Sequence, residues 1–362
     1  MAADIPNPNA PENASLCRRR RRYPQGAAKF VVIGHRGNGM NVVQSPDRRL
    51  NAFKENSIRS FNAAAHFFPD FIEFDVQVTK DDCPVIFHDD FILSQHHQDG
   101  VVEKKITELS LAEFLSYGPR KEGEEGKLKP LLRKTKDGKI ARWSVERDDA
   151  LCTLQEALEM VKPPKLGFNI ELKFEEHRVY PQEQLRRVLG AVLRVVSQHA
   201  NDRPILFSTF HPDAALMAKQ LQSMYPVFFL TNAAGGHSDP RRESLEEAVK
   251  LCLEGGLEGI VCEVKGVFRN PGLVNHIKEC NLSLFTYGTL NNVVEAVYMQ
   301  HIMGIDGVIV DFVGEISQAV ADMLKQQLDH HHNNVRAEKP NFSPKELSFL
   351  LKLIPQLIQP PH

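Results

Sequence analysis

The chain has 362 residues, of which 42% are apolar and 25% are charged, so it can bury a large core. A single α/β domain of roughly 250 residues with additions accounts for this length. The formal net charge of -2 excludes a basic surface spread over the whole chain, and we expect no nucleic-acid partner. None of the six cysteines lies in a close pair, which is typical of reduced thiols in an intracellular protein.

The first 28 residues are expected to form a disordered arm, with an organelle transit peptide as the alternative. The run 18–22 is basic, but Asp4, Glu12 and a start rich in Pro and Asn are unlike a transit peptide. No segment approaches the roughly 18 apolar residues that cross a bilayer, so we expect a soluble protein without an integral membrane span. A cytoplasmic location follows, with the plastid as the alternative.

From residue 30 onward, short β-branched runs alternate with amphipathic helical stretches, a pattern typical of a parallel sheet covered by helices. Eight runs predict strands at 30–34, 71–78, 167–173, 204–209, 227–230, 259–263, 283–287 and 307–311. The run 84–88 is expected to lie beside the second strand. Apolar stripes predict helices at 58–67, 153–161, 181–196, 211–224, 243–254 and 291–303. Eight strand and helix steps predict a TIM (β/α)8 barrel.

The barrel is assigned to residues 29–325. The stretch from about 89 to 150 breaks the alternation of strands and helices, and we expect it to form a small insertion after the second strand, above the barrel mouth. Residues 326–362 are predicted to be a polar tail in which the leucines of 343–358 form one amphipathic helix. The sequence leaves the oligomeric state open.

The second and third predicted strands carry carboxylates on one face. Because side chains alternate along a strand, Glu73 and Asp75 point into the barrel, and so do Glu171 and Lys173. Like charges held close together need a cation, and three carboxylates suit Mg²⁺, with Ca²⁺ as the alternative. Lys173 offers a positive charge to a substrate oxygen. The alternative is an internal ion pair between Lys173 and Glu171.

Two histidines follow strand ends, His35 after the first strand and His88 after the run that begins at residue 84. Both titrate near neutrality, so one can accept a proton while the other donates one during displacement at phosphorus. Arg36 offers a planar fork for a phosphate, or else forms a salt bridge with Glu55. We place Asn56 near the phosphate.

Five short motifs contain these residues: His35-Arg36-Gly37, Glu55-Asn56, Glu73-Phe74-Asp75-Val76, His88-Asp89 and Glu171-Leu172-Lys173. Their order resembles that of the glycerophosphodiester phosphodiesterases over about residues 30–318. The segments 210–213 and 286–292 are similar to the soluble plant-type branch of that family. Residues 285–288 depart from the Trp-Thr-Val-Asn type of many relatives, so we expect a different pocket for the glycerol or the head group.

The resemblance implies a TIM barrel with an insertion after the second strand. It implies hydrolysis of a glycerophosphodiester to an alcohol and sn-glycerol 3-phosphate. It also implies that His35 and His88 act as acid and base. In that family the substrate's own 2-hydroxyl is thought to attack phosphorus first, and water then opens the cyclic phosphate.

The candidate residues therefore form three groups, which are His35, His88 and Arg36 for catalysis, Lys173, Asn56 and Glu55 for substrate binding, and Glu73, Asp75 and Glu171 for a metal ion. One alternative is a lysophospholipase D-like hydrolase of the same superfamily, for which the apolar helix at 347–358 argues. The other is a catalytically silent barrel used as a binding module, against which the intact set of polar residues argues.

Overall fold

The computed structural model of the protein describes residues 30–96, 100–120, 129–135, 137–175, 177–233 and 239–332. Within these ranges, eight parallel strands form a sheet that closes on itself where β1 pairs with β2. The strands are β1 (Val31–Gly34), β2 (Phe71–Val78), β8 (Gly167–Leu172), β9 (Ile205–Thr209), β10 (Val227–Thr231), β11 (Gly259–Glu263), β12 (Ser283–Tyr287) and β13 (Gly307–Val310). The predicted TIM barrel is confirmed, and each strand lies within two residues of its predicted bounds.

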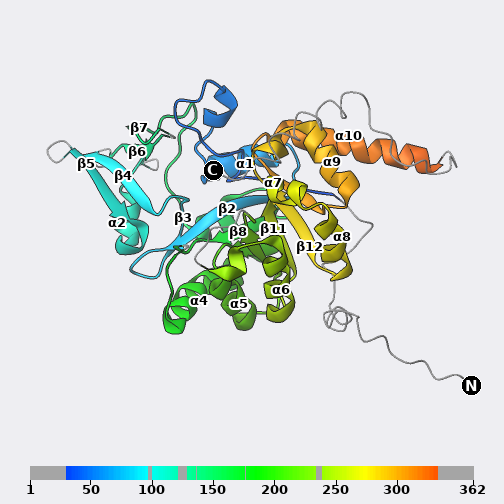
Figure 1. The fold of residues 1–362 in the computed structure, drawn as a ribbon. Helices are drawn as coiled ribbons and strands as arrows, with labels where there is room; N and C mark the ends of the chain where they lie inside the picture. The colour runs from blue at the N-terminus through cyan, green and yellow to red at the C-terminus, as the bar shows by residue number, and fades with distance from the viewer. Residues whose placement is uncertain are drawn as a thin grey trace, which may run out of the picture.

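Helices surround the barrel, as Figure 1 shows. They are α1 (Ile58–Ala65), α3 (Leu154–Met160), α4 (Gln182–His199), α5 (Pro212–Leu221), α6 (Leu245–Gly255), α7 (Val264–Arg269), α8 (Gly272–Glu279), α9 (Val294–Met303) and α10 (Val313–His332). Helix α10 runs past residue 325, where the tail was predicted to begin. The predicted helix at 343–358 and the arm at 1–28 lie outside the described residues. No described helix is both long and apolar enough to cross a membrane.

The alternation of β2 has the predicted effect. Ile72 and Phe74 face the surrounding helices and belong to the large apolar cluster between barrel and helices. The Phe74 ring packs against Phe168 of β8, with ring centroids 5.0 Å apart. Glu73 and Asp75 therefore face the barrel interior, where they are 2% and 1% exposed.

A second apolar cluster fills the interior of the barrel below the carboxyl ends of its strands. It consists of Ile33, Phe71, Leu206, Phe228, Leu230, Val261, Phe285 and Ile309. The rings of Phe228 and Phe285 stack with centroids 5.0 Å apart. The polar groups of the barrel interior consequently lie on a solid apolar floor.

The insertion contains more regular structure than the sequence suggested. β3 (Pro84–Ile86) pairs antiparallel with β2, as the run from residue 84 predicted. Beyond it, an antiparallel sheet and a short helix stand to one side of the barrel in Figure 1, consisting of β4 (Phe91–His96), β5 (Gly100–Lys105), α2 (Leu111–Leu115), β6 (Leu131–Lys134) and β7 (Ile140–Arg142). Trp143 and Phe114 belong to a separate apolar core there. β5 and β7 are short and largely exposed, so their apolar alternation is faint in the sequence.

Candidate active site

A cavity of about 710 Å³ opens between the carboxyl ends of the barrel strands and the insertion sheet. Its wall includes six of the nine predicted site residues, namely His35, Arg36, Glu73, His88, Glu171 and Lys173. The other three, Asp75, Glu55 and Asn56, are buried behind that wall and contact the residues that form it.

The three predicted metal ligands lie together. Glu73, Asp75 and Glu171 each place a carboxylate oxygen within 4.8 Å of the others. Glu73 Oε1 and Asp75 Oδ1 are buried and have no hydrogen-bond partner. Carboxylate oxygens in this number suit a hard divalent cation such as Mg²⁺ or Ca²⁺. The residues therefore fit the ion that the sequence predicts.

The surroundings of Glu73 and Asp75 shift the pKa values of these two carboxyl groups in opposite directions. Burial and the neighbouring charge of Asp75 raise the pKa of Glu73 to about 8. Burial alone would also raise the pKa of Asp75, but electrostatic interactions with His88, Lys173 and Arg36 hold that pKa well below its usual range. Without a bound cation, the ionised form is thus less favourable for Glu73 than for Asp75.

His35 is oriented by Asp311, which follows β13. The Nδ1 atom of His35 lies 2.8 Å from Asp311 Oδ1. Since the ionised carboxylate only accepts, Nδ1 carries the proton and Nε2 is left available. Asn292 fixes Asp311 in turn, because its Nδ2 donates to Asp311 Oδ2 at 2.8 Å and its Oδ1 accepts from the Asp311 amide at 2.7 Å.

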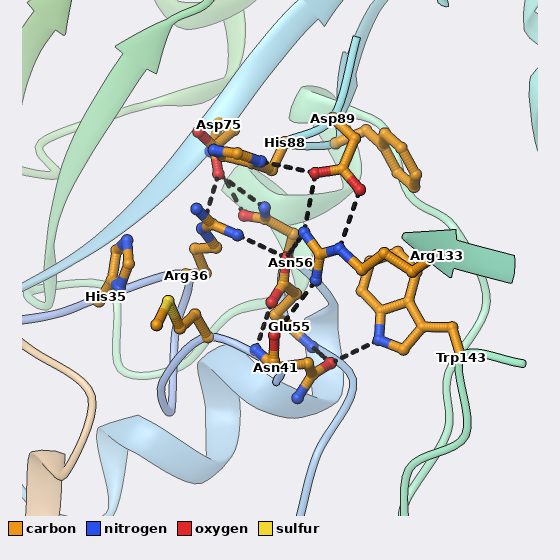
Figure 2. A network of polar contacts seen from close by, with 12 residues as sticks. His35, Arg36, Asn41, Glu55, Asn56, Asp75, His88, Asp89, Arg133 and Trp143 are labelled. Carbon is orange, nitrogen blue, oxygen red and sulfur yellow. Dashed lines mark hydrogen bonds and ion pairs between the residues drawn. The ribbon is translucent and has the colours of Figure 1, made fainter. Parts of the chain in front are cut away.

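His88 has the same kind of support on its own side of the cavity. Its Nδ1 atom lies 2.7 Å from Asp89 Oδ1. Both Asp89 oxygens accept hydrogen bonds from the guanidinium of Arg133, at 2.8 and 2.9 Å. Figure 2 shows this chain of contacts. Each histidine is therefore held at Nδ1 by a carboxylate that a third side chain fixes.

The two environments push the histidine pKa values apart. Burial alone would lower the pKa of His35, but the charge of Asp311 and the hydrogen bond to it outweigh burial, and the pKa lies above the usual 6.5. Burial, followed by the positive charge of Arg36, lowers the pKa of His88 below 6.5. One histidine is thus favoured as imidazolium and the other as neutral imidazole.

Arg36 forms the salt bridge that the sequence left as an alternative. Its Nη1 donates to Glu55 Oε1 at 2.8 Å, and its Nε lies 3.4 Å from Asp75 Oδ2. Asn56 donates to the same Asp75 oxygen at 2.8 Å. Glu55 and Asn56 do not line the cavity wall, and they support Arg36 and Asp75. Their role as substrate contacts stays a prediction.

Lys173 likewise forms the ion pair that was an alternative. Its Nζ lies 3.0 Å from Glu171 Oε1 and 3.5 Å from Asp75 Oδ1. The side chain nevertheless faces the cavity, so the ion pair and a substrate contact are compatible. Lys173 brings positive charge to the edge of the acidic cluster.

Several residues of the site were missed in the sequence. Asp311 had one signal, an acidic residue at the end of the last barrel strand. Asn292 lies in the segment 286–292 that resembles the plant-type branch, but no role was predicted for it. Arg133 had no signal, because it acts on residues distant in the sequence. Asn169, whose Nδ2 is buried without a hydrogen-bond partner in the cavity wall, was not predicted as a site residue.

Comparison with known proteins gives a consistent result. Residues 35–315 match the profile of the Glycerophosphoryl diester phosphodiesterase family. The chain is 62% identical to "Glycerophosphodiester phosphodiesterase GDPD1, chloroplastic" of Arabidopsis thaliana, covering 96% of this chain and 95% of that protein. It is 60% identical to glycerophosphodiester phosphodiesterase GDPD2 of the same plant, covering 91% and 90% of the two chains.

More distant proteins share parts of the chain or its fold. Glycerophosphocholine phosphodiesterase gde1 of Schizosaccharomyces pombe is 31% identical over 80% of this chain and 28% of its own length. A solved phosphodiesterase of Oleispira antarctica, in complex with the product sn-glycerol-3-phosphate, superposes with a TM-score of 0.57 at 22% identity, covering 81% and 97% of the two chains. At this identity the superposition shows the shared fold.

Proposed function

Because the chain belongs to the glycerophosphoryl diester phosphodiesterase family, we propose that it hydrolyses glycerophosphodiesters, glycerophosphocholine among them, to an alcohol and sn-glycerol 3-phosphate. The chain is an enzyme, a glycerophosphodiester phosphodiesterase. We also propose its substrates, its bound ion and the roles of its side chains.

One observation carries the proposed reaction. Two histidines, each held at Nδ1 by a carboxylate, face a cavity whose wall includes Glu73 and Glu171, two members of the cluster of three carboxylates. Displacement at phosphorus requires a proton acceptor, a proton donor and positive charge near the phosphate oxygens. The cavity wall contains groups suited to each requirement.

We assign the proton transfers from the opposite pKa shifts. His88, the neutral imidazole, takes the proton of the substrate's 2-hydroxyl as that oxygen bonds to phosphorus. His35, the imidazolium, gives its proton to the departing alcohol oxygen, and a cyclic phosphate remains. In the second step His35 takes a proton from water as the water oxygen bonds to phosphorus, and His88 returns its proton to the 2-oxygen.

Two positively charged side chains of the cavity wall are oriented to bind the phosphate. Arg36 and Lys173 face the cavity, and each is anchored by a carboxylate, so little reorganisation accompanies substrate binding. When bound by Glu73, Asp75 and Glu171, Mg²⁺ (or Ca²⁺) supplies further positive charge to a phosphate oxygen. Arg36, Glu73 and Asp75 are buried, which limits the screening of this attraction by water.

Glycerophosphocholine is the first substrate to test, because several relatives are named glycerophosphocholine phosphodiesterases. Esters of ethanolamine, inositol and glycerol are the comparison set. Lysophosphatidylcholine tests the lysophospholipase D-like alternative, since hydrolysis of that lipid requires space for an acyl chain.

The test is hydrolysis of glycerophosphocholine by the purified full chain with Mg²⁺, followed by measurement of choline and sn-glycerol 3-phosphate. We expect turnover by the wild type, a loss of at least about a hundredfold in His35→Ala and His88→Ala, and inhibition by EDTA. Full activity of His35→Ala would contradict the acid and base assignment. Absence of turnover with any of the diesters would favour the silent barrel.

We further propose a plastid location. The relative with 62% identity is named chloroplastic, and its similarity extends over 96% of this chain. The basic run at 18–22 lies in the segment that a transit peptide would occupy. Fluorescent fusions with and without residues 1–28 test this: plastid fluorescence only with the segment supports it, and cytoplasmic fluorescence of both supports the location expected first from the sequence.

A further inference from the structure

Arg133 lies where the insertion sheet meets the barrel. It belongs to β6, and its side chain is 12% exposed. Every guanidinium nitrogen has an acceptor within hydrogen-bond or ion-pair distance. Nε and Nη2 donate to the two oxygens of Asp89, Nη2 lies 2.9 Å from Glu55 Oε1, and Nη1 donates to the carbonyl of Asn41 at 3.4 Å. With its donors so engaged, Arg133 is occupied by protein groups although it lines the cavity.

The two carboxylates that Arg133 contacts serve different members of the site. Asp89 holds Nδ1 of His88, and Glu55 holds Nη1 of Arg36. The oxygen of Glu55 that faces Arg133 is the same Oε1 that faces Arg36. Figure 2 shows Arg133 between the two branches. One side chain of the insertion thus touches the supports of both the histidine and the arginine.

The position of Arg133 is itself fixed. Its guanidinium lies 4.1 Å from the ring centroid of Trp143, which is 5% exposed. The Trp143 indole donates to Asn41 Oδ1 at 3.1 Å, and the backbone N–H of Asn41 donates to Glu55 Oε2. These contacts form a closed ring of Arg133, Trp143, Asn41 and Glu55, which joins the insertion to the segment after β1. The planar guanidinium of Arg133 therefore has little rotational freedom.

We propose that Arg133 is a positioning residue of the phosphodiesterase reaction, which aligns His88 through Asp89 and Arg36 through Glu55. The insertion sheet thereby belongs to the catalytic apparatus. This inference rests on the proposed function. Removal of Arg133 takes away both guanidinium hydrogen bonds of Asp89 and one of the contacts of Glu55, so that His88 and Arg36 are held less firmly in their directions. Lysine keeps the charge but cannot reproduce the fork.

Arg133→Met and Arg133→Lys are compared with Arg142→Met, an exposed arginine of the same sheet. With glycerophosphocholine we expect kcat of Arg133→Met to fall by about 10- to 100-fold, with a smaller change in KM, and Arg142→Met to match the wild type. Arg133→Lys should recover little of the loss. In a cycle with Asp89→Asn, the double variant should lose less than the product of the single losses, because both changes act on His88.

A second measurement does not depend on turnover. Imidazole nitrogen NMR of the wild type should show the hydrogen-bonded Nδ1 of His88, and that signal should shift in Arg133→Met but not in Arg142→Met. Arg133→Lys serves the same purpose if the methionine variant fails to fold. A kcat of Arg133→Met within about twofold of the wild type, or an unchanged His88 signal, would overturn the inference while leaving the proposed function intact. If the wild type itself lacks activity, the proposed function fails, and the NMR comparison still decides whether Arg133 orients His88.

Discussion

His35 and His88 are the same residue type in two electrostatic environments. Burial lowers the pKa of both, but the charge of Asp311 and the hydrogen bond to it outweigh burial at His35 and raise its pKa above 6.5, whereas at His88 burial, followed by the charge of Arg36, keeps the pKa below 6.5. The proposed mechanism requires neutral His88 and protonated His35 in the first step. Residue identity alone therefore does not assign the proton transfers, and the neighbouring charges do.

This difference predicts a bell-shaped pH profile of kcat/KM. Activity should rise as the pH passes the pKa of His88, below 6.5, because His88 then loses its proton. It should fall as the pH passes the pKa of His35, above 6.5, because His35 then loses its proton as well. In Asp311→Asn the falling limb should move to lower pH, since the charge that favours protonated His35 is removed. A falling limb unmoved by this change would assign it to another group.

A second prediction concerns Asn292, which holds Asp311 in place. Because its amide fixes both the side chain and the backbone of Asp311, Asn292→Ala should lower kcat by about tenfold. Asn62→Ala is the comparison: Asn62 accepts a hydrogen bond from the Lys162 amide on an exposed part of the barrel. Equal kcat in the two variants would show that Asp311 holds His35 without help.

The secondary structure elements were predictable to different degrees. The barrel strands were predicted well because one face of each is apolar and packs on helices, which leaves a regular pattern in the sequence. β4 to β7 gave faint signals because they are short, and β5 and β7 are also largely exposed. The histidines were predicted from their places at strand ends, and the carboxylates from the alternation of side chains along the second and third strands. Arg133 could not be, since it lies 44 residues from its partner Asp89 in a segment of weak pattern.

Two glycines show how element geometry affects stability. Gly37 follows β1 with φ +90°, and a Cβ there would lie 2.6 Å from Ser60 Oγ and 2.8 Å from Phe61 Cδ1. Gly190 lies inside α4, where a Cβ would meet nothing within 4 Å. Gly37→Ala should therefore destabilise the protein by about 1–3 kcal/mol, whereas Gly190→Ala should stabilise it by about 0.5–1 kcal/mol. Urea denaturation measures both, and a loss of stability in Gly190→Ala would contradict the helix propensity argument.

At the scale of the whole molecule, the acidic cluster links ion binding to stability. Burial makes the ionised form of Glu73 unfavourable beside Asp75, so a divalent cation should stabilise the folded chain. We expect Mg²⁺ to raise the Tm of the EDTA-treated protein and to restore hydrolysis. In Glu73→Gln the Tm should respond much less, because one ligand and its repulsion are gone. An equal response of the two proteins would place the ion elsewhere.

The apolar floor of the barrel also bears on kinetics. Eight packed side chains fill the interior below the site, so substrate and products pass through the same mouth. The alcohol carries no phosphate, whereas sn-glycerol 3-phosphate keeps the group that Arg36 and Lys173 would contact. The phosphate product should therefore depart last and occupy the site that the next substrate needs. Accumulated sn-glycerol 3-phosphate should then slow turnover as a competitive inhibitor, and free choline should not.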